Sequence, residues 1–422
     1  MPRWPLPLKP WPSWVASALT FLASCAPGMR LDPALPRREP WVFVLLREDT
    51  GTIALEAPDG AALLEGRRGD TLAIWPPGTR VRWAVDSLGR WRSADTALAP
   101  TAPRLVVRPP ADRPVRVDGR QVRGAVVLEA NRTRPRVVNA LPLEAYLRGV
   151  VPREIGRLSD TLLAAAQAQA VAARTYALVR LGARATQGFD LYATVQDQAY
   201  GGVDAELPTT DRAVATTAGE VLVFGGWPID AYYHSTCGGR TAAVEEVWPW
   251  HPPRPYLVSV PDIDPHTGQA FDRASRYFRW TVRWTAAQLD SILRTTLQDS
   301  LPVGVATVGP LRDLVLRDTT PSGRVRTLDI VTTTATFRVG GDRVRWILRR
   351  PDGQPLYSSA FRLRLERDAS GKLQAVLAEG RGWGHGVGLC QVGAIGRAGA
   401  GRSYRDILRA YYPGARLVDL YE

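Results

Sequence analysis

Residues 159–182 read SDTLLAAAQAQAVAARTYALVRLG, and this stretch predicts the clearest helix in the chain. The Ser-Asp pair at its start can cap free N–H groups, the alanine-rich run has high helix propensity, and Gly182 suits the position after its end. Gln167 and Arg174 lie seven residues apart, on one face of an otherwise apolar helix. That polar stripe is either a solvated face or one wall of a polar cleft.

Strand-like sequence flanks this helix on both sides. From Trp41 to about Glu129, short apolar runs alternate with turn signals such as Asp59-Gly60, which is typical of a small β-rich domain. Strands and hairpins are predicted again in residues 256–375, with helices around 286–297 and 403–411. The fold class predicted is α+β: a β-rich N-terminal domain followed by a mixed helix and strand core with an elongated cleft.

The composition divides the chain into three parts. Residues 1–25 form an export signal, and residues 26–114 form a tether and the β-rich domain, which ends in a Pro-rich seam. Residues 115–422 form the second domain. Within it, the segments 140–240 and 376–415 carry the motifs described below, and the strand-rich segment 256–375 lies between them.

The export signal has a positive start and a largely apolar stretch from Trp11 to Ser24. That stretch is shorter than the ~20 apolar residues that span a bilayer, and it fits the core of a secretory signal peptide. The run Leu22-Ala23-Ser24-Cys25 looks like a bacterial lipobox, in which Cys25 is lipidated. We therefore expect an exported, membrane-anchored lipoprotein that faces the periplasm or cell wall; the alternative is a plain cleaved signal with a chance cysteine.

The net charge of +13 and the pI of about 10.1 raise the question of nucleic-acid binding. Only Lys9 and Lys372 are lysines, and the arginines are scattered among acidic residues instead of being gathered in one block. No nucleic-acid-binding motif accompanies them. We expect no nucleic-acid partner, although a basic surface would steer the protein toward an anionic wall or membrane.

Three segments of the chain carry the residue types that chemistry needs. They read LEAYLRGVVPREIG at 143–156, YYHSTCGG at 232–239 and GRGWGHGVGLCQVGA at 380–394. In this order the segments resemble the stage II sporulation protein D family, also called SpoIID/LytB. The resemblance covers roughly residues 115–415, and the β-rich start is matched only loosely.

The resemblance implies a function and a catalytic residue. Characterised members of the family are lytic transglycosylases that cut peptidoglycan glycan strands, preferring strands without peptide stems. The glutamate of their Val-Val-Pro-x-Glu motif is the acid/base, and Glu154 occupies that position. Such an acid works when burial raises its pKa to ~6–7, and the apolar neighbours of Glu154 can provide that burial. The alternative is a surface carboxylate at a helix start.

In this reaction one carboxyl group suffices, whereas a hydrolase usually needs two. The C6 hydroxyl of the same muramic residue attacks C1 and leaves a 1,6-anhydro end. Glu144, also in the first motif, is expected to stabilise a helix start; the alternative is a second active-site carboxylate.

Several other motif residues are predicted to bind the substrate. Arg174 could hold the lactyl carboxylate of muramic acid through two hydrogen bonds, or it could form an ion pair with Glu144 or Glu154. The histidines could contact sugar hydroxyls, orient Glu154, or be structural. The full set of predicted substrate-binding residues is Arg174, Tyr176, His234, Ser235, His385 and Gln391.

Apart from Cys25, the chain has two cysteines, Cys237 and Cys390. Three states are open: a disulfide, a structural zinc site that includes His234, and two free thiols. Some relatives bind zinc, but we expect no required cofactor. Some family members are described as modifiers of wall amidases, so a glycan-binding activator of an amidase partner is the alternative function.

Overall fold

The computed structural model describes residues 31–32, 35–48, 51–66, 69–93, 101–111, 113–130, 134–299 and 308–421. Cys25 and the predicted export signal lie outside these residues. Within the described part of the chain, no helix is both long enough and apolar enough to span a bilayer.

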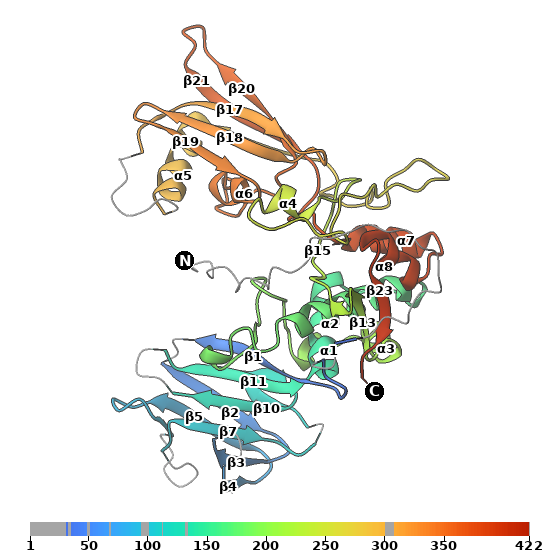
Figure 1. Ribbon diagram of the computed structural model, residues 1–422. Coiled ribbons are helices and arrows are strands. Elements are labelled where there is room, and N and C mark those ends of the chain that lie inside the picture. Colours follow the sequence, from blue (N-terminus) through green and yellow to red (C-terminus); the bar gives the residue numbers. More distant parts are fainter. Residues whose placement is uncertain are drawn as a thin grey trace, which may run out of the picture.

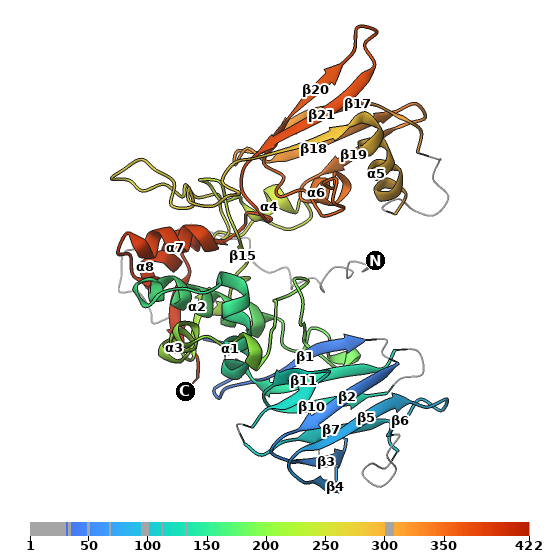
Figure 2. The same cartoon turned by 180° about the vertical axis from the view of Figure 1, so that it is seen from behind.

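The protein combines sheets and helices in three parts, which Figures 1 and 2 show from opposite sides. A β-rich part holds the N-terminal strands, a central layer holds most of the helices, and an upper lobe holds the later strands. The α+β class predicted from the sequence is confirmed.

The β-rich part consists of two sheets whose apolar faces share one core. The seven-stranded sheet has the order β12-β1-β11-β10-β7-β3-β4, and the five-stranded sheet has the order β6-β5-β2-β8-β9. The strands are β1 (Trp41–Glu48), β2 (Thr52–Ala57), β3 (Ala61–Glu65), β4 (Thr71–Trp75), β5 (Thr79–Val85), β6 (Trp91–Ser93), β7 (Arg104–Arg108), β8 (Val115–Val117), β9 (Arg120–Val122), β10 (Ala125–Glu129), β11 (Arg136–Pro142) and β12 (Leu191–Tyr192).

The β-rich part continues past the Pro-rich seam, so the predicted boundary at 114/115 is corrected. Strand β8 pairs with β2, β10 pairs with β7, and β11 pairs with β1. The Pro-rich seam, residues 99–114, therefore does not end the unit, because strand β7 lies within it and the strands before and after it pair with each other. Apart from β12, which joins the edge of the seven-stranded sheet from later in the chain, the unit ends at Pro142, where β11 runs directly into a helix.

The central layer contains the predicted helix of residues 159–182, which the structure forms as a 3₁₀ turn followed by α2. The C-terminal helix α8 begins as predicted, because the backbone N–H of Asp406 donates to the Ser403 hydroxyl at 3.2 Å. The elements of this layer are α1 (Leu143–Ile155), α2 (Leu163–Val179), α3 (Pro208–Thr216), β13 (Glu220–Phe224), β14 (Trp227–Pro228), β15 (Tyr233–His234), β22 (Leu389–Cys390), α7 (Gln391–Gly399), α8 (Tyr404–Tyr411) and β23 (Arg416–Asp419).

The upper lobe has two three-stranded sheets, β16-β21-β20 and β17-β18-β19, and a core of its own around the buried side chains of Trp284 and Leu328. A capping box starts α5, in which Thr285 and Gln288 exchange hydrogen bonds of 3.1 and 3.0 Å. The elements are α4 (Val244–Val247), which leads into the lobe, β16 (Trp280–Thr285), α5 (Ala286–Gln298), β17 (Leu311–Thr319), β18 (Val325–Thr332), β19 (Thr336–Gly340), α6 (Arg343–Ile347), β20 (Phe361–Arg367) and β21 (Leu373–Gly380).

The chain leaves the central layer after β15 and returns to it at β22. These two short strands are parallel and adjacent, with His234 opposite Cys390. Next to them, the backbone of Thr236 pairs with that of Trp383. The second and third motif segments therefore lie side by side, although more than a hundred residues separate them.

Candidate active site around Glu154

Glu154 lies in the last turn of α1, which Gly156 ends with a φ of 81°. This places the carboxyl group at the C-terminal end of the helix, not at a helix start. The carbonyl dipoles at that end disfavour a negative charge. The position in the helix therefore favours the protonated form of Glu154.

Glu154 receives hydrogen bonds from distant parts of the chain. The backbone N–H of Ala199 donates to Oε1 at 2.8 Å, and Nε2 of Gln391 donates to Oε2 at 3.4 Å. The hydroxyl of Tyr233 also hydrogen-bonds the carboxylate. Glu154, Tyr233 and Gln391 come from the first, second and third motif segments, so the structure brings all three segments to one carboxyl group.

Burial raises the pKa of Glu154, while its hydrogen bonds and the charge of Arg153 act in the opposite direction. Burial is the largest of these effects, since an ionised carboxylate loses more solvation than a neutral one. A larger fraction of Glu154 therefore holds a proton at neutral pH than an exposed glutamate would. This is the property that an acid catalyst requires.

Buried polar side chains hold Tyr233 in place through hydrogen bonds. The Tyr146 hydroxyl donates to Gln198 Oε1 at 3.2 Å, and Gln198 Nε2 donates to the Tyr233 oxygen at 2.9 Å and to the Ala173 carbonyl at 3.2 Å. Because the Tyr233 oxygen already accepts from Gln198, its own proton is available for Glu154. Gln198 is fully buried, and its hydrogen bonds set the direction of the Tyr233 hydroxyl.

Gln391 is held in a similar way. Its Nε2 atom lies 3.4 Å from Oε1 of Gln169, a fully buried residue of α2. The site residues predicted from the sequence include His234, next to Tyr233. They do not include Tyr233, Gln169, Gln198 or Ala199. Tyr233 and Gln169 stood inside the motif-bearing stretches, whereas Gln198 and Ala199 lie in an irregular loop with no local signal.

Arg174 does not face the site, which corrects its predicted role in binding a sugar carboxylate. Its side chain has no exposed surface, and its Nε and Nη2 atoms donate to the two carboxylate oxygens of Glu144, each at 2.7 Å. It also donates to the carbonyl of Glu220 at 3.2 Å. The polar stripe of α2 packs against α3 and β13, so the alternative of an ion pair with Glu144 is confirmed.

Glu144 is likewise not a second carboxylate of the site. It is ten residues before Glu154 on the same helix, which corresponds to about 15 Å along the axis. Paired glycosidase carboxyls lie about 5–9.5 Å apart. Glu144 also accepts from the Tyr421 hydroxyl at 2.7 Å, so its oxygens are occupied by structural partners.

Tyr176 and Ser235 lie close to the site but make contacts of their own. Tyr176 is buried, the Arg180 guanidinium covers its ring at 3.4 Å, and its ring centre lies 6.1 Å from that of Tyr233. Ser235 is half-buried, and its hydroxyl lies 3.3 Å from that of Thr236. Their substrate-binding roles stay predictions, as does that of Gln391.

The two motif histidines pack against each other, with ring centres 5.5 Å apart. The Nδ1 atom of His234 hydrogen-bonds the Val387 carbonyl at 3.2 Å, and burial holds the pKa of His234 well below its usual value. Burial also lowers the pKa of His385 to about 4. Both imidazoles are therefore neutral at pH 7, and among the described residues no hydrogen bond joins either of them to Glu154.

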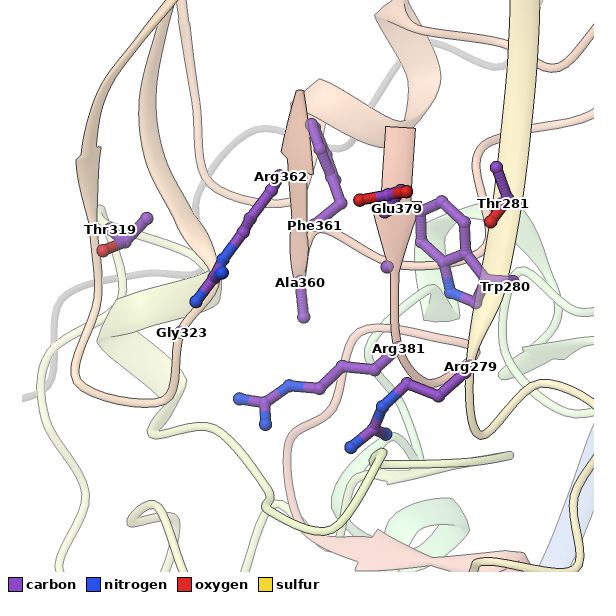
Figure 3. A pocket seen from close by; sticks show the side chains of 11 residues that line it. Arg279, Trp280, Thr281, Thr319, Gly323, Ala360, Phe361, Arg362, Glu379 and Arg381 are labelled. Atoms are coloured by element: carbon purple, nitrogen blue, oxygen red, sulfur yellow. The ribbon is translucent and has the colours of Figure 1, made fainter. Parts of the chain in front are cut away.

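Two pockets lie away from Glu154. One, of about 740 Å³, is in the upper lobe, and Figure 3 shows Arg279 and Arg381 at one end of it, with Arg362 and Glu379 also among its lining side chains. The other, of about 400 Å³, lies between the β-rich part and the loop after α2. Neither is lined by Glu154, so an elongated cleft at Glu154 stays a prediction.

Cys237 and Cys390 are both buried and free, with no disulfide between them. His234 points away from them, toward Val387 and His385. In place of His234, two aspartates accompany the cysteines, Asp262 and Asp272, and the donor atoms of the four residues lie within 4.8 Å of one another. These are the residues of this part of the chain that could hold a metal ion.

Comparison with known proteins agrees with the motif assignment. Residues 131–224 match the family model described as stage II sporulation protein (SpoIID). The chain is 30% identical over 320 residues to stage II sporulation protein D of Bacillus subtilis, covering 70% of this chain and 82% of that protein. The chain belongs to the stage II sporulation protein D family.

Other relatives match less completely. The chain is 31% identical over 301 residues to the amidase enhancer of Bacillus subtilis, but it spans only 40% of that protein's length. It is 29% identical over 288 residues to an uncharacterized protein of Brachyspira hyodysenteriae, of which it covers 68%. Residues 266–388, which include most of the upper lobe, match a separate domain of unknown function (DUF8618).

Proposed function

We propose that this member of the stage II sporulation protein D family is a cell-wall lytic transglycosylase. It cleaves the MurNAc–GlcNAc bond of peptidoglycan glycan strands, preferably strands without peptide stems. The observation that carries the proposal is the environment of Glu154. This carboxyl group has a raised pKa and receives its hydrogen bonds from the second and third motif segments and from Ala199.

In the first step, Glu154 acts as the acid. Its Oε1 atom is fixed by the short bond from Ala199, while Oε2 has the longer contact to Gln391. Oε2 is therefore the oxygen that carries the proton to the glycosidic oxygen. The bond between C1 and that oxygen then breaks, and GlcNAc leaves with the proton.

In the second step, the carboxylate of Glu154 acts as the base. The C6 hydroxyl of the same MurNAc residue attacks C1, and its proton passes to Glu154. The product is a 1,6-anhydro-MurNAc end, Glu154 is protonated again, and no water is consumed. Between the two steps, the Tyr233 hydroxyl stabilises the carboxylate by donating to it, because charge-assisted hydrogen bonds are stronger than neutral ones.

The position of Glu144 supports a transglycosylase over a hydrolase. Hydrolysis requires a second carboxyl group within reach of the sugar. The other carboxylate of the first motif is about 15 Å away along α1 and is bound to Arg174. One acid/base with an internal nucleophile fits this arrangement better.

We further propose that the protein is exported and anchored through a lipidated Cys25. A second function has one specific observation in its favour, since a relative bears the name amidase enhancer. In that case the chain would bind glycan and stimulate a wall amidase without cutting the strand. Such a binder has no need of an acid with a raised pKa, so Glu154 favours the enzyme.

The test is mass spectrometry of purified glycan strands, with and without stem peptides, after incubation with residues 26–422. We expect 1,6-anhydro-MurNAc ends from the wild type and none from Glu154→Gln, while Glu366→Gln, an exposed upper-lobe control, retains activity. Reducing ends in place of anhydro ends would show hydrolysis. If the strands stay uncut but bound, and an added amidase is stimulated, the amidase-activator function would replace the lytic transglycosylase function.

A further inference from the structure

Four buried side chains meet behind the two short strands β15 and β22. Cys237 follows β15, Cys390 ends β22, and Asp262 and Asp272 come from the irregular segment that precedes β16. All four are buried, and their donor atoms lie within 4.8 Å of one another. Two of the four come from outside every motif segment.

The cluster holds more acidic groups than cations. Asp262 has a partner for its charge, because Arg397 donates to its Oδ1 atom at 3.0 Å and the Tyr411 hydroxyl donates to the same atom at 2.8 Å. Asp272 forms no ion pair with any described residue. Its Oδ1 atom is buried and has no hydrogen-bond partner in the described part of the protein. A buried carboxylate without a cationic partner is costly, so the cluster lacks a positive charge.

The distances fit a single metal ion. Cys237 Sγ lies 3.3 Å from Asp262 Oδ2 and 3.3 Å from Asp272 Oδ2, and Cys390 Sγ lies 3.8 Å from Asp272 Oδ2. Zinc binds oxygen at about 2.0 Å and sulfur at about 2.3 Å, so the edges of its ligand tetrahedron measure about 3.3–3.8 Å. The three distances above match these edges, and all four donor atoms lie within 4.8 Å of one another.

Hydrogen bonds around the cluster hold its donor atoms in place. Cys390 Sγ accepts backbone N–H groups of Cys237 at 3.2 Å and Gly393 at 3.3 Å. Asp272 Oδ2 accepts from the N–H of Gly238 at 2.6 Å. Gly393 leaves room for the cluster, since a Cβ atom there would overlap Asp262 Oδ2 and the Tyr411 hydroxyl. Such outer contacts orient metal ligands in known sites.

We propose that Cys237, Asp262, Asp272 and Cys390 bind one Zn²⁺ ion. With four protein ligands the site is closed, so the ion is structural and not catalytic. It joins the second and third motif segments and the segment before β16. Gln391 follows Cys390 directly and contacts Glu154, so the ion also fixes the start of α7 beside the active site. The proposal does not depend on the reaction that Glu154 catalyses.

A disulfide between Cys237 and Cys390 is the main competitor. It would bring no positive charge, and Asp272 would stay buried without a cationic partner. The two arrangements also differ in what they need, because a disulfide needs the two cysteines alone whereas the metal site needs the aspartates as well. Replacing Asp272 therefore separates them.

The experiment measures metal content by mass spectrometry in the exported, mature chain, purified without a metal-affinity tag. We expect about one zinc per chain in the wild type, as in closed structural sites, and at least a tenfold lower zinc affinity in Asp272→Asn and Cys237→Ser. Asp264→Asn is the matched control, because Asp264 lies in the same segment and bonds only its local turn. Circular dichroism checks that each variant is folded.

Thiol counting on the denatured wild-type chain completes the test. Two reactive thiols together with bound zinc support the site. A Cys237–Cys390 disulfide, or two thiols without metal after dialysis against zinc and removal of the excess, overturns it. Zinc that Asp272→Asn retains at full affinity also overturns it, because the aspartate would then not be a ligand.

Discussion

Ala199 donates its backbone N–H to Oε1 of Glu154 at 2.8 Å, from a loop that begins well after α2 has ended. This single bond fixes one oxygen of the carboxyl group, and the other oxygen contacts Gln391. Among substitutions of Ala199 itself, only proline would remove this backbone donor. The orientation of the acid is therefore secured by the path of the main chain, and substitutions around it alter its protonation before they alter its position.

Glu154→Gln is expected to stabilise the protein near pH 7. The folded-state pKa of Glu154 is raised by burial, so the contribution of Glu154 to the free energy of unfolding is greatest below its unfolded pKa and is lost as the pH rises through its folded pKa. Glutamine cannot ionise, so the variant does not lose this part of the free energy of unfolding as the pH rises. The free energy of unfolding in urea should favour the variant near pH 7 and be equal for both proteins near pH 4. Equal values at both pH values would mean that the carboxylate is well solvated.

Tyr233→Phe is expected to move the basic limb of the pH–activity profile upward. The Tyr233 hydroxyl lowers the pKa of Glu154 by bonding its charged form, and removing it lets burial raise that pKa further. Glu154 then stays protonated to higher pH, while the maximal rate falls by about tenfold, which is less than the roughly 10²–10⁴-fold that acid–base catalysis as a whole contributes. Turnover of glycan strands across pH checks this. Tyr277→Phe, which changes a tyrosine outside the site, should leave the limb where it is.

Arg174→Ala is expected to destabilise the protein by about 3–5 kcal/mol, because it leaves Glu144 without its buried partner. Substrate binding by the remaining folded protein should not change, since Arg174 has no exposed surface. Urea unfolding and KM measured on the folded fraction test the two statements separately. Arg212→Ala, which removes an exposed ion pair with Asp160, is the control and should unfold like the wild type. A higher KM with unchanged stability would restore the sugar-binding role.

The protein is expected to lose stability as the pH falls from about 6.5 to 4. Burial lowers the pKa of His385 to about 4 and that of His234 well below its usual value. The unfolded chain therefore takes up protons first, and a group with a lowered pKa stabilises the fold only above its unfolded value. His385→Asn should reduce the slope of melting temperature against pH in this range. An unchanged slope would show that His385 is solvated.

The sequence predicted elements well where the signals are local. The helix of residues 286–297 begins at a capping box in the structure, and the helix of 403–411 begins at a serine cap. The same local reasoning failed at the Pro-rich seam near residue 114. Prolines indicate where strand pairing is interrupted. They do not indicate that β8 and β10 pair with strands that come earlier in the sequence, β2 and β7.

The candidate site was predictable only in part, for a similar reason. The spacing of Gln167 and Arg174 correctly placed them on one face of α2, but spacing does not say what that face meets. Glu154 was found through its motif. Its partner Ala199, and the aspartates beside Cys237 and Cys390, lie in irregular segments whose contacts span 25 to 118 positions of sequence. Such contacts leave no periodic signal.

Trp280 at the start of β16 pairs with Gly380 at the end of β21. The chain therefore enters and leaves these strands of the upper lobe at the same place. The indole of Trp280 closes this neck by donating to the carbonyl of Gly382 at 2.9 Å. The lobe is thus a cassette, attached to the rest of the chain by two neighbouring strands and carrying its own core. A different lobe could therefore replace this one without changing the path of the chain through the central layer. The shape of the lobe can change while Glu154 keeps its position.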